Sequence, residues 1–176
     1  MMISRRATAL AAPNNGIATH MVYKPEHRPM RAVAAAGLPA QYGYVIASTA
    51  FTAGVLQWQA IRVSLARRTY GVNYPKLYAE GEGEDARTFN CTQRAHQNTL
   101  ETAPAMTIMT CMLGLLCPVT AASLQALWAV GRIVYALGYS TGDPSKRLPG
   151  GVVSSLTFLG TIIATLVAGL RAALAA

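Results

Sequence analysis

The sequence predicts an all-α integral membrane protein in which four transmembrane helices form an up-down bundle. Of its 176 residues, 52% are hydrophobic and only 12% are charged, about half the charged share of a soluble domain. The apolar residues gather in four long segments, at residues 42–65, 95–116, 121–137 and 152–174. A helix that spans the hydrocarbon needs about 20 largely apolar residues. Three segments meet this length as they stand, and the third along the chain needs its polar ends to reach the interface.

The first 40 residues differ from the rest. We expect a basic N-terminal extension at 1–40 and a helical membrane domain at 41–176. The extension holds five Lys or Arg residues and one acid, Glu26, and it is broken by Pro and Gly. This composition resembles a mitochondrial transit peptide and does not pack into a folded unit alone. An ordered extension of this kind indicates a partner protein that holds it.

The connections between the apolar segments set the topology. The first connection, at 66–91, is the longest, the second is little more than Cys117–Pro118, and the third is a short basic loop at 140–151. With four spans, both long polar connections lie on one side of the membrane and both termini on the other.

Membrane anchoring explains the excess of positive charge. The formal net charge is +8, but basic residues flank the apolar segments, as in Arg67–Arg68 and Lys146–Arg147, where they anchor helices at the interface. No basic stripe is interleaved with aromatic residues, so the pattern argues against nucleic-acid binding. The three cysteines form no CxxC pair, and the sequence predicts no metal site.

The segment RAHQNTLE at 94–101 places polar groups at the start of a long apolar run. Because a helix turns by about 100° per residue, Arg94, Asn98 and Glu101 form one stripe, whereas His96 lies off it. Guanidinium, amide and carboxylate groups on one stripe suit a zwitterionic ligand. The alternative is an Arg–Glu pair that only holds the bundle together, although charged groups within spans are functional candidates by default. For His96, a place at the wet boundary of the membrane is the simpler interpretation.

The end of the third segment, GRIVYALGYSTGDPSKR, repeats this arrangement. Arg132, Tyr135 and Tyr139 share one helix face, and Arg147 follows shortly after. An aromatic belt at the membrane interface would explain each tyrosine alone. Arginines beside a phenol-lined pocket also favour the thiolate form of a thiol. The cluster therefore predicts activation of a thiol, with an apolar second substrate that arrives from the lipid.

Three stretches carry a resemblance to a known family: FNCTQRAHQNTLE, GRIVYALGYSTGDPSKR and VNYPKLY. Together with four spans, they resemble the MAPEG family, the membrane-associated proteins of eicosanoid and glutathione metabolism. The resemblance covers about residues 40–175 and is strongest to the branch of microsomal glutathione transferase 3. It implies a four-helix bundle that forms a homotrimer, with glutathione as co-substrate bound in a U shape between neighbouring subunits.

The resemblance also implies roles for individual residues. Arg147 would stabilise the thiolate as the catalytic residue, and glutathione would be contacted by Arg67, Arg94, His96, Asn98, Glu101, Tyr135 and Tyr139. The chain departs from the family in three places. Thr102 follows Glu101 where the family commonly has an aromatic residue, the basic extension is longer than the family needs, and the end RAALAA lacks the cysteines common in that branch.

These observations favour a glutathione transferase or peroxidase of the endoplasmic reticulum or a mitochondrial membrane. Such an enzyme conjugates glutathione to lipophilic electrophiles or reduces lipid hydroperoxides, and its partners are membrane lipid and other copies of the chain. The alternative is a non-catalytic accessory subunit of a large membrane complex, for example in the mitochondrial inner membrane. The basic extension and the missing aromatic residue favour that alternative. A third possibility is a lipid-binding scaffold without catalysis, against which Arg147 and the tyrosines argue.

Overall fold

A computed structural model describes residues 37–175, and within them the chain is helical, with no strand. The elements are α2 (Tyr42–Thr69), α3 (Glu84–Gly114), α4 (Pro118–Tyr139), a short 3-10 helix η1 (Pro144–Arg147) and α5 (Leu148–Leu174). The prediction of an all-helical domain is confirmed. The expectation that a partner orders the basic extension falls almost wholly on residues outside the described range.

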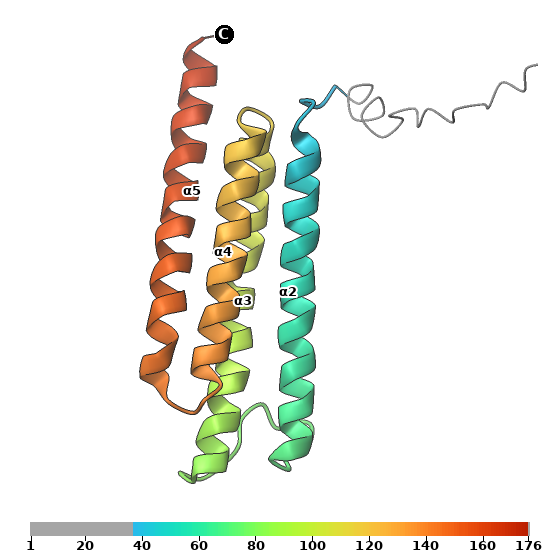
Figure 1. Cartoon of the computed structure of the whole chain (residues 1–176), viewed down its shortest axis with the longest axis vertical. Helices are drawn as coiled ribbons and strands as arrows, with labels where there is room; N and C mark the ends of the chain where they lie inside the picture. The colour runs from blue at the N-terminus through green and yellow to red at the C-terminus, as the bar shows by residue number, and fades with distance from the viewer. Residues whose placement is uncertain (1–36, 176) are drawn as a thin grey trace, which may run out of the picture.

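The helix α4 stands at the centre of the bundle. It packs against each of α2, α3 and α5, and α2 and α5 lie on opposite sides of it (Figure 1). The start of α2, the α3–α4 turn at residues 115–117 and the end of α5 lie at one end of the bundle, the terminal end (Figure 1). The α2–α3 connection and η1 lie at the other, the loop end. This is the up-down order expected from the connections, with the tight turn at Cys117–Pro118.

The helix α3 begins well before the apolar segment that predicted it. It starts at Glu84 rather than Ala95, and its first turn holds Glu84 and Asp85, whose negative charges suit the positive end of the helix dipole. The segment 94–101 therefore lies in the body of α3. The apolar run had suggested instead that this segment stands at the start of a helix. The reason is that hydropathy marks where a helix meets apolar surroundings, not where its hydrogen-bonded backbone begins.

Side chains from α2, α3 and α4 fill the centre of the bundle. One buried cluster joins Val55, Met106 and Trp128, one from each of these helices. Nearer the loop end, a second buried cluster includes Cys91 and Tyr135. The two clusters fix the register of α3 against α4, on which the site described below depends.

The helices α4 and α5 approach each other closely near the loop end. A Cβ added at Gly150 would collide with backbone atoms of Tyr135 and Gly131 on α4. A Cβ added at Gly131 would lie 3.0 Å from the backbone nitrogen of Ser154 on α5. Small residues let the backbones of membrane helices come together. The two glycines therefore hold α5, and the loop that precedes it, against α4.

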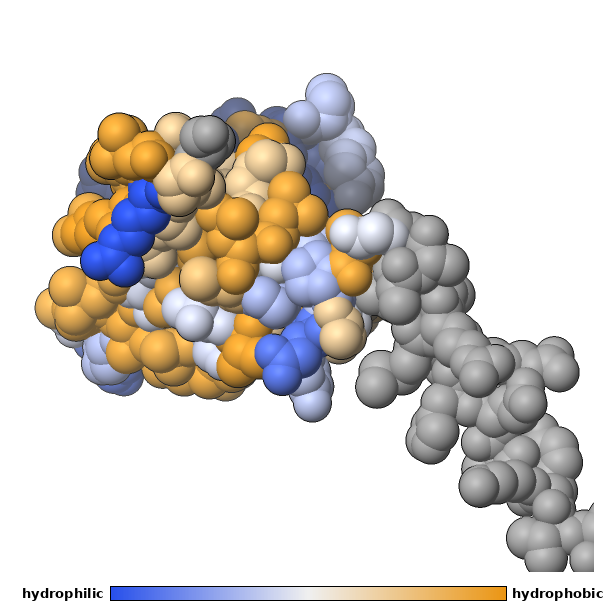
Figure 2. Space-filling model, turned by 90° about the horizontal axis from the view of Figure 1, so that it is seen from above, coloured by the Kyte–Doolittle hydropathy of each residue, from blue (hydrophilic) through white to orange (hydrophobic). Residues whose placement is uncertain are grey.

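Two stretches of the described residues are long and apolar enough to cross a membrane, Pro118–Tyr139 and Pro144–Leu174. Most of the second stretch is exposed, and its exposed large residues are Leu, Val and Ile. Seen from the terminal end, apolar residues cover much of the outer surface of the bundle (Figure 2). The helices α2 and α3 are not apolar enough to meet this criterion for a membrane span. A bundle with four spans therefore stays a prediction.

Candidate functional site

The residues of the predicted polar stripe, Arg94, Asn98 and Glu101, contact one another along α3. A guanidinium nitrogen of Arg94 lies 2.9 Å from Glu101 Oε1, and the Asn98 amide nitrogen donates to Glu101 Oε2 at 3.1 Å. Both oxygens of the Glu101 carboxylate are therefore used within the stripe. All three side chains are at least partly exposed, so the stripe is open to a ligand that can replace these contacts.

Arg132 reaches the polar stripe from α4. Its guanidinium donates to Thr99 Oγ1 at 3.0 and 2.8 Å and to Asn98 Oδ1 at 2.9 Å. Arg132 is 5% exposed and Thr99 0%, so these hydrogen bonds compensate a buried charge. They also orient the Asn98 amide, with its oxygen toward Arg132 and its nitrogen toward Glu101. Sequence reasoning did not find Thr99, because the register between two helices is not visible in the periodicity of either one.

Arg132 also begins a stack of guanidinium groups and rings, the aromatic ladder, formed by Arg132, Tyr135, Tyr139 and Arg147. The Arg132 guanidinium carbon lies 4.2 Å from the ring centre of Tyr135. The rings of Tyr135 and Tyr139 meet edge to face with their centres 5.6 Å apart. Arg147 lies 4.8 Å from the ring centre of Tyr139 and donates to its hydroxyl at 2.9 Å. Both tyrosines are buried, so they do not form an aromatic belt that faces lipid.

The loop between α4 and α5 holds Arg147 over the ring of Tyr139. Asp143 Oδ1 accepts hydrogen bonds from the backbone nitrogen and the hydroxyl of Ser145, at 2.9 and 2.7 Å. These bonds lower the pKa of the Asp143 carboxyl. A Cβ at Gly138 would collide with the backbone of Lys146, so the loop is packed against the end of α4. Arg147, the last residue of η1, is thereby directed back toward Tyr139 at the end of α4.

Two of the predicted glutathione-binding residues lie apart from the others within one chain. Arg67, near the end of α2, donates to the carbonyl oxygen of Lys76 at 2.6 Å, and its guanidinium stacks on Tyr74 and Phe89. It therefore holds the α2–α3 connection. His96 is half-buried on another face of α3 and forms no side-chain hydrogen bond with the residues that the structure describes.

Two grooves meet at the aromatic ladder. The polar groove, of about 490 Å³, opens toward the loop end and is lined by Tyr78, Gly81, Glu82, Arg87, Asn90, Cys91, Arg94 and Tyr139. The apolar groove, of about 390 Å³, lies between α4 and α5 and is lined by Tyr135, Arg147, Leu148, Gly151, Val152, Ser155 and Leu156. The contact of Arg147 with Tyr139 joins the two linings. A group bound at this contact can therefore extend into polar surroundings on one side and apolar surroundings on the other.

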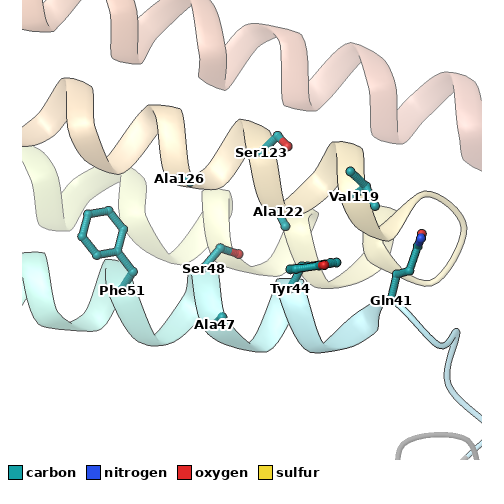
Figure 3. Close-up of a pocket in the computed structure, with 9 residues that line it drawn as sticks. All are labelled: Gln41, Tyr44, Ala47, Ser48, Phe51, Val119, Ala122, Ser123 and Ala126. Carbon is teal, nitrogen blue, oxygen red and sulfur yellow. The ribbon is translucent and has the colours of Figure 1, made fainter. Parts of the chain in front are cut away.

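A third hollow, of about 590 Å³, lies between α2 and α4 near the terminal end. The side chains of Tyr44, Ser48 and Phe51 extend from α2 toward α4 (Figure 3). The first turns of α4 contribute Val119, Ala122, Ser123 and Ala126 to the lining. None of the predicted site residues lines this hollow, and it lies toward the other end of the bundle from the ladder.

The site carries more positive than negative charge. Glu101 neutralises Arg94, whereas Arg132 and Arg147 form no ion pair among the described residues. Arg147, which is partly exposed, can therefore contact an anionic ligand, and the buried charge of Arg132 adds to the positive potential beside it. Cys91, a thiol in the lining of the polar groove, is 6% exposed, and burial raises its pKa despite the opposing effect of Arg147. This sulfur is therefore poorly suited to act as a nucleophile.

Comparison with models of protein families gives one finding. The model described as the MAPEG family matches residues 45–167. This range takes in α3, α4 and η1 and most of α2 and α5, and it contains every residue of the polar stripe and the aromatic ladder.

Proposed function

The chain belongs to the MAPEG family, and on this premise we propose that it is a membrane-bound glutathione transferase or peroxidase. The match covers well over half of the chain and names a family of membrane-associated proteins. The resemblance noted in the sequence is thus confirmed for the family, while its branch and its activity belong to the proposal. The observation that carries the activity is the contact of Arg147 with the Tyr139 hydroxyl, where a polar and an apolar groove meet.

Glutathione matches the charge of the site. Its ammonium and two carboxylates give a net charge of about −1 at neutral pH, and ionisation of its thiol gives about −2. Arg132 and Arg147 supply the complementary positive charges. The γ-glutamyl end suits the polar stripe, because Arg94 offers forked donors to a carboxylate and Glu101 accepts from an ammonium. Binding in this way exchanges one ion pair within the stripe for two with the ligand.

Arg147 and Tyr139 act on the thiol in this proposal. The Tyr139 oxygen accepts a hydrogen bond from Arg147, so its own O–H can donate to a sulfur anion, and Arg147 keeps further N–H donors. Both groups stabilise the thiolate and so lower the pKa of bound glutathione.

The thiolate then reacts in one of two ways. With an electrophilic carbon, the sulfur forms the new bond and the leaving group departs with its electron pair. With a hydroperoxide, the sulfur attacks the terminal oxygen, the O–O bond breaks, and the alkoxide takes up the proton released by the thiol. A second glutathione converts the resulting sulfenic acid to the disulfide and water.

The apolar groove supplies a place for the lipophilic substrate. Leu148, Val152 and Leu156 of its lining are exposed on α5, so a hydrophobic molecule can enter sideways from the bilayer. Tyr135 and Arg147 line the same groove, which brings such a molecule beside the proposed position of the thiolate.

The proposal includes four spans and a homotrimer with the site shared between neighbouring subunits. Arg67 and His96 lie away from the ladder in one chain, as expected if each contacts glutathione held mainly by a neighbour. Arg67 would then exchange its hydrogen bond to the Lys76 carbonyl for one to the ligand. A membrane of the endoplasmic reticulum or the mitochondrion is the proposed location.

The test is an activity assay on the purified full-length protein in detergent micelles. We expect conjugation of glutathione to chlorodinitrobenzene or reduction of cumene hydroperoxide, and a loss of about 100-fold or more in Arg147→Ala, the range for removing one preorganised donor. Lys146→Ala, which removes an adjacent exposed cation, is the matched control and should keep the activity. The ultraviolet absorbance of bound thiolate at neutral pH should disappear only in Arg147→Ala. Equal activity in both variants, or no activity in the wild type, contradicts the proposal.

One observation favours the accessory-subunit alternative. Where the family commonly has an aromatic residue, Thr102 turns its hydroxyl back to the carbonyl oxygens of Asn98 and Thr99, at 3.5 and 3.3 Å, and offers no ring to a ligand. A single copy of the chain within a larger complex, without glutathione binding, would support this alternative over the enzyme.

A further inference from the structure

We propose that an anionic phospholipid binds at the terminal end of the bundle, with an acyl chain in a groove beside α5 and its phosphate at Arg171. This lipid groove has a volume of about 430 Å³ and lies between the α3–α4 turn and the last turns of α5. Apart from Arg171, the Cys117 thiol and the Thr120 hydroxyl, its lining is apolar. No residue of the polar stripe or the aromatic ladder lines it, so the proposal does not depend on glutathione.

The shape of the lipid groove suits a slender apolar chain. The groove follows α5 from Ala164 to Ala172, a rise of about 12 Å. On its inner side, Ala164 packs against the buried cluster that contains Leu113. Leu116 and Val167 line the groove and are exposed. Small side chains beside larger apolar ones therefore leave an elongated hollow that opens toward the surroundings of the bundle.

Arg171 places a positive charge at the outer end of this groove. Within residues 37–61, 102–131 and 148–175, which contain the terminal end, Arg171 is the only Asp, Glu, Lys or Arg. It is exposed in the last turn of α5, and the last turns of α5 extend beyond the α3–α4 turn (Figure 1). From Arg147 to Arg171 a helix rises by about 36 Å, slightly more than the hydrocarbon thickness of about 30 Å. With Arg147 at one interface, Arg171 thus lies among the headgroups of the other leaflet.

The start of α4 adds hydrogen-bond donors at the same groove. The helix begins at Pro118 without a side-chain cap, and the backbone N–H groups of Val119 and Thr120 meet no acceptor among the described residues. Unsatisfied N–H groups are costly in apolar surroundings, and a phosphate oxygen is an acceptor that suits a helix start. Anchoring at the interface would explain Arg171 alone. It does not explain a groove that joins this cation to an uncapped helix start.

An anionic phospholipid matches both the apolar and the polar part of the groove. Its acyl chain covers the apolar lining, and its phosphate oxygens accept from Arg171 and from the start of α4. A headgroup with net negative charge is favoured over phosphatidylcholine, because the choline cation offsets the attraction of the phosphate to an arginine.

Cys117 offers a built-in measure of occupancy, because its thiol lines the groove and is exposed. Full-length protein in detergent micelles is treated with N-ethylmaleimide, and modification of Cys117 is followed by peptide mass spectrometry. Phosphatidylglycerol and phosphatidylcholine with the same acyl chains are added in parallel. We expect phosphatidylglycerol to protect Cys117 at an about fivefold lower mole fraction than phosphatidylcholine, as for one arginine near an anionic lipid. Inorganic phosphate, which has charge but no chains, should not protect it.

Three variants test the role of Arg171. In Arg171→Gln the ratio of the two protective mole fractions should fall toward one, whereas Arg171→Lys should keep most of it. Arg68→Gln, which removes an exposed cation at the loop end, is the matched control and should keep the wild-type ratio. The ratio is taken within each variant, because a nearby cation also changes the reactivity of the thiol itself.

Several outcomes would overturn the proposal. Equal protection of the wild type by both lipids, or a wild-type ratio in Arg171→Gln, removes the basis for recognition of an anionic headgroup. Protection by inorganic phosphate alone would assign the site to a free anion. Protection that rises with protein concentration in the absence of lipid would assign the groove to a second copy of the chain.

Discussion

Replacing Thr99 by valine removes the main acceptor of a buried charge while keeping the shape of the side chain. The Thr99 hydroxyl accepts two hydrogen bonds from Arg132, at 3.0 and 2.8 Å, and donates one to the carbonyl oxygen of Ala95 at 2.9 Å. After Thr99→Val, the Arg132 guanidinium keeps its bond to Asn98 and its contact with the Tyr135 ring, but two of its three hydrogen bonds are gone.

The expected loss in the free energy of unfolding is about 2 kcal/mol. Hydrogen bonds to charged groups contribute about 1.5–3 kcal/mol in soluble proteins, whereas polar contacts between membrane helices average about 0.6 and reach about 1.7 kcal/mol. The two bonds share one acceptor, so they do not count twice. Removing every partner of a buried charge costs about 3–5 kcal/mol, and the remaining Asn98 bond keeps the loss below that range.

The assay is reversible unfolding in mixed detergent micelles, followed by circular dichroism. Thr102→Val is the matched control, because the Thr102 hydroxyl donates only to carbonyl oxygens of its own helix; its loss should stay below about 0.5 kcal/mol. Thr99→Ser keeps the acceptor and should retain most of the stability. Equal losses in Thr99→Val and Thr102→Val would refute the assignment of Thr99 as the acceptor that stabilises buried Arg132.

Two further predictions concern the loop end. Gly150→Ala should lower the free energy of unfolding by about 3 kcal/mol, the upper range for overpacking, because its Cβ meets the backbone of Tyr135. In the control Gly160→Ala, the added Cβ has open space. That substitution should raise the free energy of unfolding by no more than about 1 kcal/mol. The hydrogen bonds from Ser145 lower the pKa of the Asp143 carboxyl in the folded protein. The stability that this carboxylate contributes is therefore fully present above its pKa in the unfolded chain, about 4. It is lost as the pH falls through the lower pKa of the folded state. Denaturation of wild type and Asp143→Ala from about pH 7 to pH 3 should therefore show a difference that narrows in acid; a constant difference would contradict the assigned hydrogen bonds.

Much of the fold follows from patterns within single segments. The apolar segments located all four helices, and the spacing of Arg94, Asn98 and Glu101 placed them on one face, where the structure has them in contact. The start of α3 at Glu84 was missed, because its first turns are polar and lie outside the apolar run. Gly83 and the acidic first turn are signals that could have located this start.

What the sequence could not supply is the relation between segments. Thr99 looked like an ordinary polar residue of α3 until the register against α4 placed it under Arg132. Arg67 was assigned to glutathione by resemblance, yet within the chain it stacks on Tyr74 and Phe89. Both cases depend on which side chains meet across helices or loops, and the periodicity of one helix carries no such information.

The hydrogen bonds of α4 and α5 have a consequence for the order in which the chain enters the bilayer. The buried hydroxyls of α5, on Ser154, Thr157 and Thr161, each donate to a carbonyl oxygen of α5 itself, so this helix carries its polar groups already satisfied. It can insert alone and dock on α4 afterwards. The charge of Arg132, in contrast, has its acceptors on α3. If α3 spans the bilayer as the sequence predicts, we therefore expect α3 and α4 to insert as one hairpin, on which α5 docks afterwards.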